Sequence, residues 1–207
     1  MHPDAYPVPA GKEEYESRVL GSRFLAKLIP VKDEEEARLC REVLLQQYPD
    51  ARHHCWALQL GKPGKETRRF SDEGEPAGSA GAPIARAIAS SGLSDLLIVV
   101  IRWFGGKKLG VGGLIRAYTD ASREVLSRIE PRLRYEMLEL QGLIDFAEEA
   151  AMRRLLDKLE GRILSAEYGE KGLSWHLEMP KSKVPDFLER SRELGRGKEA
   201  FQVRTRD

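Results

Sequence analysis

The stretch DLLIVVIRWFGGKKLGVGGLIRAY, residues 95–118, decides the fold. It begins with an apolar, largely β-branched run, 96–101, whose short length predicts a buried strand rather than a membrane span. A loop with five glycines follows, and it contains Lys107 and Lys108. Apolar residues then recur at helical spacing from Leu114 onward, which predicts that a helix begins near Gly112 or Gly113.

A strand, a glycine-rich basic loop and a helix start, in this order, favour the binding of an anion such as phosphate. Glycine lets a ligand approach the backbone amides closely. The first N–H groups of a helix have no intrahelical partner and lie at the positive end of the dipole. A P-loop, however, has Lys followed by Ser or Thr at the helix start, where this chain has Leu114, and the GxGxxG pattern is absent. A turn that packs the helix closely on a sheet therefore stays open as an alternative.

Length and composition describe an ordinary globular chain. The 207 residues can form one large or two small domains. The formal net charge is +1, so no overall basic excess indicates a nucleic-acid partner. No secretory signal and no bilayer-spanning run are visible. Cys40 and Cys55 form no CxxC pattern, so we expect free thiols and a cytoplasmic location.

The segments before the central stretch alternate between strands and a helix. Residues 1–14 contain three prolines and predict a loose arm or an edge segment. Residues 16–31 predict one or two strands, and Asp33 with Glu36 predicts a capped helix that ends near residue 49. Residues 52–60 predict a strand. His53 and His54 are neighbours on it and would point to opposite faces, so they predict no metal site.

The segment SDEGEPAGSAGAPI, residues 71–84, is too rich in glycine and proline for a regular element. Its carboxylates could bind a divalent cation, act as acid or base, or pair with nearby arginines; a solvated acidic turn is the simpler alternative. The groups concerned are the acids Asp72, Glu73 and Glu75 and the arginines Arg68, Arg69 and Arg102. Like the central loop, this loop precedes a helix, here from residue 80 or 81. If the two loops form one site, Asp72 and Glu75 should lie close to Arg102 or Lys107.

A second domain is predicted after Pro131, because proline cannot continue the helical hydrogen bonds. We therefore place the domains at residues 1–131 and 132–207. The pattern that follows is strand, helix, strand, strand, helix, strand, at 135–143, 146–159, 163–168, 173–179, 181–194 and 200–204. This βαββαβ order is typical of a ferredoxin-like domain. His176 stands alone on a strand, and nothing in this half indicates catalysis.

Two motifs carry a family resemblance, RFSDEGEPAGSAGAPI (69–84) and VVIRWFGGKKLGVGGLIRAY (99–118). They closely resemble the IMPACT family in its two-domain bacterial, YigZ-type branch. The family patterns read roughly D-x-G-E-P-x-G-[ST]-A-G-x-P-[IL] and R-[YW]-F-G-G-x-K-L-G-x-G-G-L-x-R-A-Y. Both are matched nearly in full, and the one modest departure is Lys107, where some members carry Ile or Val. With the length and the second domain, the resemblance covers almost the whole chain.

The resemblance implies an α+β fold in two parts. The N-terminal domain should have the ribosomal protein S5 domain 2-like fold, an α/β sandwich shared with domain IV of the translocating elongation factor. The C-terminal ferredoxin-like domain should resemble domain V of that factor. Bacterial members have no settled biochemical activity to carry over. Eukaryotic relatives regulate translation through the pathway that activates an initiation-factor kinase, with an extra N-terminal domain that is not found in these residues.

Three functions stay open at this point. The first is binding of structured RNA or the ribosome, without catalysis and with a translation-associated regulatory role. The second is an enzyme acting on a phosphorylated or nucleotide substrate, with Mg²⁺ at the acidic loop as its one cofactor; no nucleophile–base pair or Walker signature supports it. The third is a protein–protein regulator of a translation factor or kinase. No membrane partner is expected.

The first function assigns specific contacts. The residues predicted to bind phosphate or nucleic acid are Arg68, Arg69, Arg102, Lys107, Lys108, Gly110, Gly112, Gly113 and Arg116. Trp103 and Phe104 are the rings predicted to stack on bases.

Overall fold

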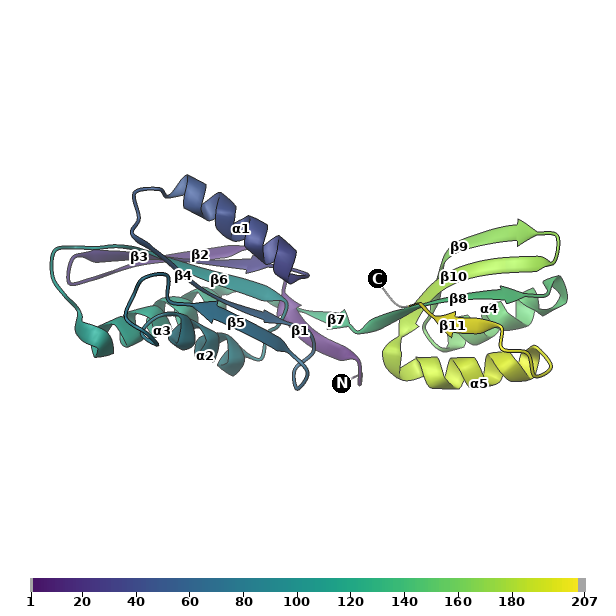
Figure 1. The fold of residues 1–207 in the computed structure, drawn as a ribbon. Coiled ribbons are helices and arrows are strands. Elements are labelled where there is room, and N and C mark those ends of the chain that lie inside the picture. The colour runs from purple at the N-terminus through teal and green to yellow at the C-terminus, as the bar shows by residue number, and fades with distance from the viewer. Residues whose placement is uncertain (1, 205–207) are drawn as a thin grey trace. The chain divides into compact units, whose positions relative to one another are not determined.

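The computed structural model describes residues 2–204, which form an α+β protein with two compact units (Figure 1). One unit is Tyr6–Arg134, and the other combines the residues up to Ala5 with Tyr135 and the residues after it. The division thus falls after Arg134 rather than after Pro131. The first residues also belong with the second unit, because the Asp4 carboxylate accepts hydrogen bonds from the backbone and the hydroxyl of Ser182.

The first unit is built on a five-stranded sheet with the order β2-β3-β6-β4-β5. The strands are β2 (Glu13–Val19), β3 (Ser22–Pro30), β6 (Leu96–Trp103), β4 (His53–Leu60) and β5 (Thr67–Ser71), each antiparallel to its neighbours. The central strand β6 is buried from Leu96 to Arg102, as its continuous apolar run predicts.

Helices cover both faces of this sheet (Figure 1). Helices α2 (Gly81–Ser91) and α3 (Gly110–Arg128) lie on one face, and α1 (Glu34–Gln47) lies on the other. Successive residues of β6 alternate between the two cores, as side chains of a strand must. The predicted cap of α1 is confirmed, because the Asp33 carboxylate accepts the Glu36 N–H at 2.7 Å.

The N-terminal residues decide between the two predicted alternatives, a loose arm and an edge segment. Strand β1 (Ala5–Pro9) pairs with β7 (Pro131–Tyr135) in a two-stranded sheet, so the edge segment is correct there and the loose arm is not. Prolines are tolerated in such a pair because each strand has only one neighbour. The Tyr6 hydroxyl also donates to Asp95 at 2.8 Å and holds β1 in place. Pro131 follows the end of α3, as predicted, but it also begins a strand.

The second unit has the predicted βαββαβ order, with strands in the order β11-β8-β10-β9. Its elements are β8 (Met137–Ile144), η1 (Phe146–Glu148), α4 (Glu149–Lys158), β9 (Arg162–Gly169), β10 (Gly172–Pro180), η2 (Lys181–Lys183), α5 (Val184–Leu194) and β11 (Phe201–Val203). Both long helices lie on one face of the sheet (Figure 1). None of the helices between residues 2 and 204 is long and apolar enough to cross a membrane.

Candidate nucleic-acid interface

The two motifs meet through one buried ion pair. Glu75 of the first loop accepts a hydrogen bond from Arg102, at the end of β6, with 2.6 Å between Oε1 and Nη1. The Glu75 and Arg102 side chains are 4% and 6% exposed. The predicted proximity of the two motifs is therefore confirmed for this pair. Because a charge buried without its partner is very unfavourable, each residue holds the other in place.

Tyr118 and Cys55 extend this pair into a network. The Tyr118 hydroxyl, from α3, donates to Glu75 Oε1 at 2.8 Å. The Cys55 thiol, on β4, lies 2.9 Å from the carbonyl oxygen of Asp72 and 3.3 Å from the Tyr118 oxygen. Burial raises the pKa of Cys55 to about 12 and also raises the pKa of Tyr118. Both groups are therefore neutral at physiological pH, and the thiol has little of the thiolate character that a nucleophile needs.

Asp72 organises the first loop from within. Its carboxylate accepts the backbone N–H groups of Gly78, Ala80 and Gly81 at 2.8 to 2.9 Å. It thereby satisfies free N–H groups at the start of α2, as a capping side chain does. Burial disfavours the charged form, but these three hydrogen bonds outweigh it and lower the pKa of Asp72.

Glu73 is held by β4. Its Oε1 accepts the indole N–H of Trp56 at 3.0 Å, and its carbonyl oxygen accepts from His53 Nδ1 at 2.9 Å. The three acids of this loop thus face three different sets of donors. No group of three or more His, Cys, Asp or Glu side chains suited to a metal ion occurs in residues 2–204. These carboxylates do not converge as an Mg²⁺ site requires.

Glycine serves close packing at the start of the second loop. A Cβ atom on Gly105 would lie 1.8 Å from the carbonyl carbon of Gly21, in the turn between β2 and β3. The Gly105 N–H also donates to the Ser22 hydroxyl at 3.1 Å. This glycine therefore serves close packing, but against the β2–β3 turn rather than between a helix and the sheet, which was the alternative that the sequence left open. Gly110 and Gly112 differ, because a Cβ atom on either would meet nothing within 4 Å.

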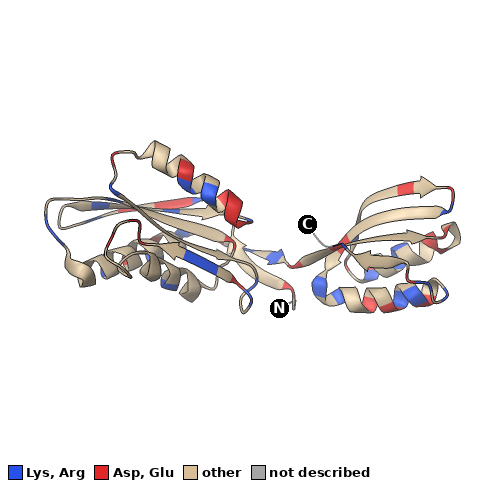
Figure 2. Cartoon of the chain, viewed as in Figure 1, with Lys and Arg blue, Asp and Glu red and all other residues tan. Residues whose placement is uncertain are grey.

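The rest of the second loop directs its charges outward. Lys107, Lys108 and Arg116 are exposed, and within the described residues none of the three forms an ion pair. Helix α3 begins at Gly110, slightly earlier than predicted, without a side-chain cap or an acidic residue in its first turn. The positive end of its dipole is therefore not compensated by a residue of the cap or of its first turn. Figure 2 shows the basic segment in this loop between β6 and α3.

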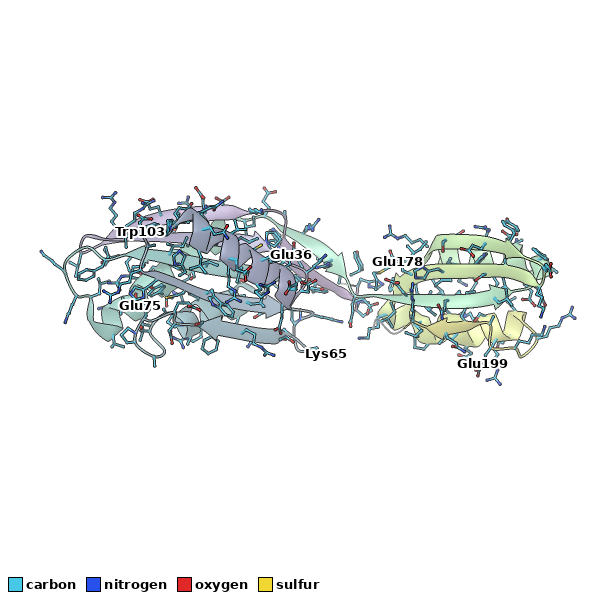
Figure 3. All side chains as sticks on the ribbon, turned by 45° about the horizontal axis from the view of Figure 1, so that its top comes forward. Glu36, Lys65, Glu75, Trp103, Glu178 and Glu199 are labelled. Carbon is cyan, nitrogen blue, oxygen red and sulfur yellow. The ribbon has the colours of Figure 1, made fainter. Side chains whose placement is uncertain are left out.

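Only one of the two predicted stacking rings is available beside these lysines. Phe104 is 50% exposed, and the Arg102 guanidinium carbon lies 5.8 Å from its centroid. Trp103, the next residue along the strand, faces the α1 side (Figure 3). There the Arg23 guanidinium lies 4.2 Å from the Trp103 ring, and the indole donates to Asp50.

The structure also separates the predicted arginines from the loop. Arg102 is buried and paired with Glu75, so its charge serves the fold. Arg68 and Arg69 lie on β5, opposite Gln59 and Leu58 of β4. Those residues pair with the beginning of β6, whereas Lys107 follows its end. At about 3.3 Å per residue along a strand, the two basic segments are roughly 20 Å or more apart.

The sequence reading missed Tyr118, Cys55 and Ser22 as members of the network. Tyr118 carried a signal, because it is a hydroxyl at a core position of the predicted helix and a buried hydroxyl needs a partner. Cys55 and Ser22 are brought to the motifs by strand pairing, which a local pattern does not reveal. His53 and His54 do lie on opposite faces of β4, as the alternation predicts.

The fold and the two loops together define the class of protein. It is a two-domain α+β protein in which two glycine-rich motifs of the first unit are joined by a buried ion pair. The family model described as the Impact N-terminal domain matches residues 20–126. An IMPACT family member of Haemophilus influenzae is 37% identical over 161 residues, 77% of this chain and 78% of that protein. The IMPACT family member YigZ of Escherichia coli is 29% identical over 195 residues, 94% of this chain and 95% of that protein. The chain belongs to the IMPACT family.

The same arrangement recurs in a solved structure. A crystal structure described as that of a hypothetical protein matches with a TM-score of 0.73 and 28% identity. The match covers 99% of this chain and 98% of that one. The two-domain α+β arrangement predicted from the sequence is thus shared by a protein of similar length.

Proposed function

We propose that the loop between β6 and α3 binds structured RNA by its phosphates and one stacked base, in a translation-associated regulatory role. The observation that carries the proposal is the pair of unpaired lysines, Lys107 and Lys108, beside the exposed ring of Phe104. Lysines attract phosphates of any sequence, and an aromatic ring accepts the face of an unstacked base. Gly110 and Gly112 leave room for the backbone of a ligand at the amides that open α3.

Gly112 supports this proposal independently of charge. It lies in the first turn of α3 without a positive φ, and no atom lies close enough to require glycine there. Glycine in a helix is less favourable than alanine by roughly 0.5–1 kcal/mol. The fold itself gains nothing from Gly112, whereas a ligand gains access to the helix N-terminus.

The alternatives have less support from the geometry. The acids that would hold Mg²⁺ in an enzyme already accept hydrogen bonds from Arg102, Trp56 and the start of α2. Their arrangement supports a rigid loop rather than an ion site. A protein partner in translation is compatible with the same surface, and the experiment below separates it from RNA.

The test is the affinity for ribosomal RNA and transfer RNA at two salt concentrations, with and without Mg²⁺. We expect the double variant Lys107→Ala/Lys108→Ala to weaken binding by about tenfold or more near 0.1 M salt. The slope of log affinity against log salt should fall by about 1 to 2, since roughly one counterion is released per phosphate contact.

The matched control is Arg68→Ala/Arg69→Ala, which removes the same formal charge from the far end of the sheet. We expect this control to bind RNA nearly as tightly as the natural chain. Equal losses in the two double variants would show a diffuse charge effect and contradict the assigned site. Absence of salt-dependent RNA binding in the natural chain would reject the proposed function and favour a protein partner.

A further inference from the structure

The turn between β2 and β3 contains an unusual residue, Leu20. The turn has two central residues, Leu20 and Gly21, with φ of +48° and +84°. Two-residue hairpin loops with positive φ at both positions favour Asn, Asp or Gly at the first, because a Cβ atom is disfavoured there. Leu20 is moreover 59% exposed. A leucine at this position is unfavourable both for its backbone and for its hydration.

The turn lies directly against the proposed RNA-binding loop. Gly21 and Gly105 approach so closely that neither position has room for a Cβ atom. The Ser22 hydroxyl accepts the Gly105 N–H at 3.1 Å and lies 3.4 Å from Arg102 Nη2. Leu20 and Phe104 each precede one glycine of this pair, so their backbones are held at a fixed distance. Arg102 is itself held by Glu75. The buried network therefore fixes both the β2–β3 turn and the start of the second loop, which together we call the tip.

We infer that Leu20 and Phe104 form an apolar wedge that enters an irregular point in an RNA helix. The inference rests on the proposed function and names its substrate as a bulge, internal loop or helix end. The base faces of a regular A-form helix are stacked and covered, and its deep major groove excludes side chains. An unstacked step instead offers base faces to a leucine and a ring. Lys107 and Lys108 then contact the flanking phosphates.

The charge of the surface favours RNA over a protein as the occupant of the tip. Two lysines and the start of α3 follow Phe104 directly in the chain, and no acidic residue lies between Phe104 and Arg116. Apolar side chains alone would suit a protein partner as well. Their combination with this run of positive charge matches a polyanion that also exposes flat apolar surfaces.

The test uses two RNA hairpins of the same stem sequence, one fully paired and one with a three-nucleotide bulge. The natural chain should bind the bulged hairpin about tenfold more tightly than the paired one. Leu20→Asn suits the turn and removes the apolar side chain, so the variant should fold at least as well. We expect it to lose most of the preference while it keeps its affinity for the paired hairpin.

Two comparisons keep this inference distinct from the proposed function. Lys107→Ala/Lys108→Ala should weaken binding of both hairpins by the same factor and leave their ratio unchanged. Phe104→Ala should reduce the ratio as Leu20→Asn does. If the natural chain binds both hairpins equally, or if Leu20→Asn keeps the full preference, the wedge is rejected although the lysine site stands. If neither hairpin binds, the proposed function is rejected, and the wedge is rejected with it.

Discussion

The loop from Asp72 to Ala80 and the loop from Phe104 to Leu109 both resemble binding loops in the sequence. Each combines glycines with charges and precedes a helix. In the structure, the acids of the first loop are bonded to Arg102, Trp56 and backbone amides, whereas the lysines of the second loop have no acidic partner among residues 2–204. A charged motif can thus serve the fold or a ligand, and the positions of its counter-charges decide which.

The largest effect is expected when the ion pair that holds the first loop, Glu75 with Arg102, is broken. Glu75→Gln removes the charge that faces buried Arg102, and we expect it to lower the free energy of unfolding by about 3–5 kcal/mol. Glu73→Gln is the control, because its amide oxygen can still accept the Trp56 indole N–H, and it should cost less than about 0.5 kcal/mol. Urea denaturation measures both. Similar small losses in the two variants would mean that Glu75 is not a structural residue.

The next effect tests the contact that joins the β2–β3 turn to the second loop. Gly105→Ala places a methyl group against the backbone of Gly21, and we expect a loss of about 3 kcal/mol, near the upper end for overpacking. The melting temperature should fall correspondingly. A variant as stable as the natural chain would show that the two segments can separate freely, and it would weaken the case for a fixed tip.

A smaller effect concerns Asp72, whose hydrogen bonds hold the start of α2. Asp72→Asn should cost about 1–2 kcal/mol near neutral pH, because both carboxylate oxygens accept N–H groups and the amide turns an NH₂ group toward one of them. Because the folded state lowers the pKa of Asp72, its stabilisation is complete above about pH 4 and is lost as the pH falls through the folded-state pKa. The stability difference between the two chains should therefore shrink between pH 6 and pH 3. A difference that stays constant would contradict this role.

The smallest effect separates folding from binding. Gly112→Ala should leave stability unchanged or raise it by up to about 1 kcal/mol, since the added methyl group meets no atom within 4 Å. If a phosphate approaches the first amides of α3, the same change should weaken RNA binding severalfold. A stabilised variant with full RNA affinity would show that this glycine serves neither the fold nor the ligand.

Much of the fold could be predicted from local patterns. The sequence predicts the buried run of β6 and the cap at Asp33. It also predicts the βαββαβ order of the second unit and contains both motifs. The sequence left a loose arm and an edge segment both open for β1, because its pairing with β7 joins residues more than a hundred positions apart. The predicted binding residues stay a prediction. Their placement could not be predicted locally, since strand order puts Arg68 and Arg69 far from Lys107, and the first loop brings Glu75 to Arg102.

Which side of the sheet a residue faces was also decided by the structure. Trp103 and Phe104 are neighbours in the sequence, yet strand alternation puts Trp103 against α1 and Phe104 at the exposed tip. The positive φ of Leu20 and the contact of the neighbouring Gly21 with Gly105 are likewise not visible in the sequence. A sequence pattern records residue types, whereas these distinctions depend on register and backbone conformation.

The most direct test of the contrast between the two loops follows backbone amide resonances while a bulged RNA hairpin is added. We expect large shifts at Leu20 and Gly21 and from Phe104 to Gly113, with small shifts on β5 at Arg68 and Arg69. The amides of Gly78, Ala80 and Gly81, which are bonded to Asp72, should stay nearly unchanged. Large shifts on β5 or within the Asp72 loop, with a silent β6–α3 loop, would contradict it.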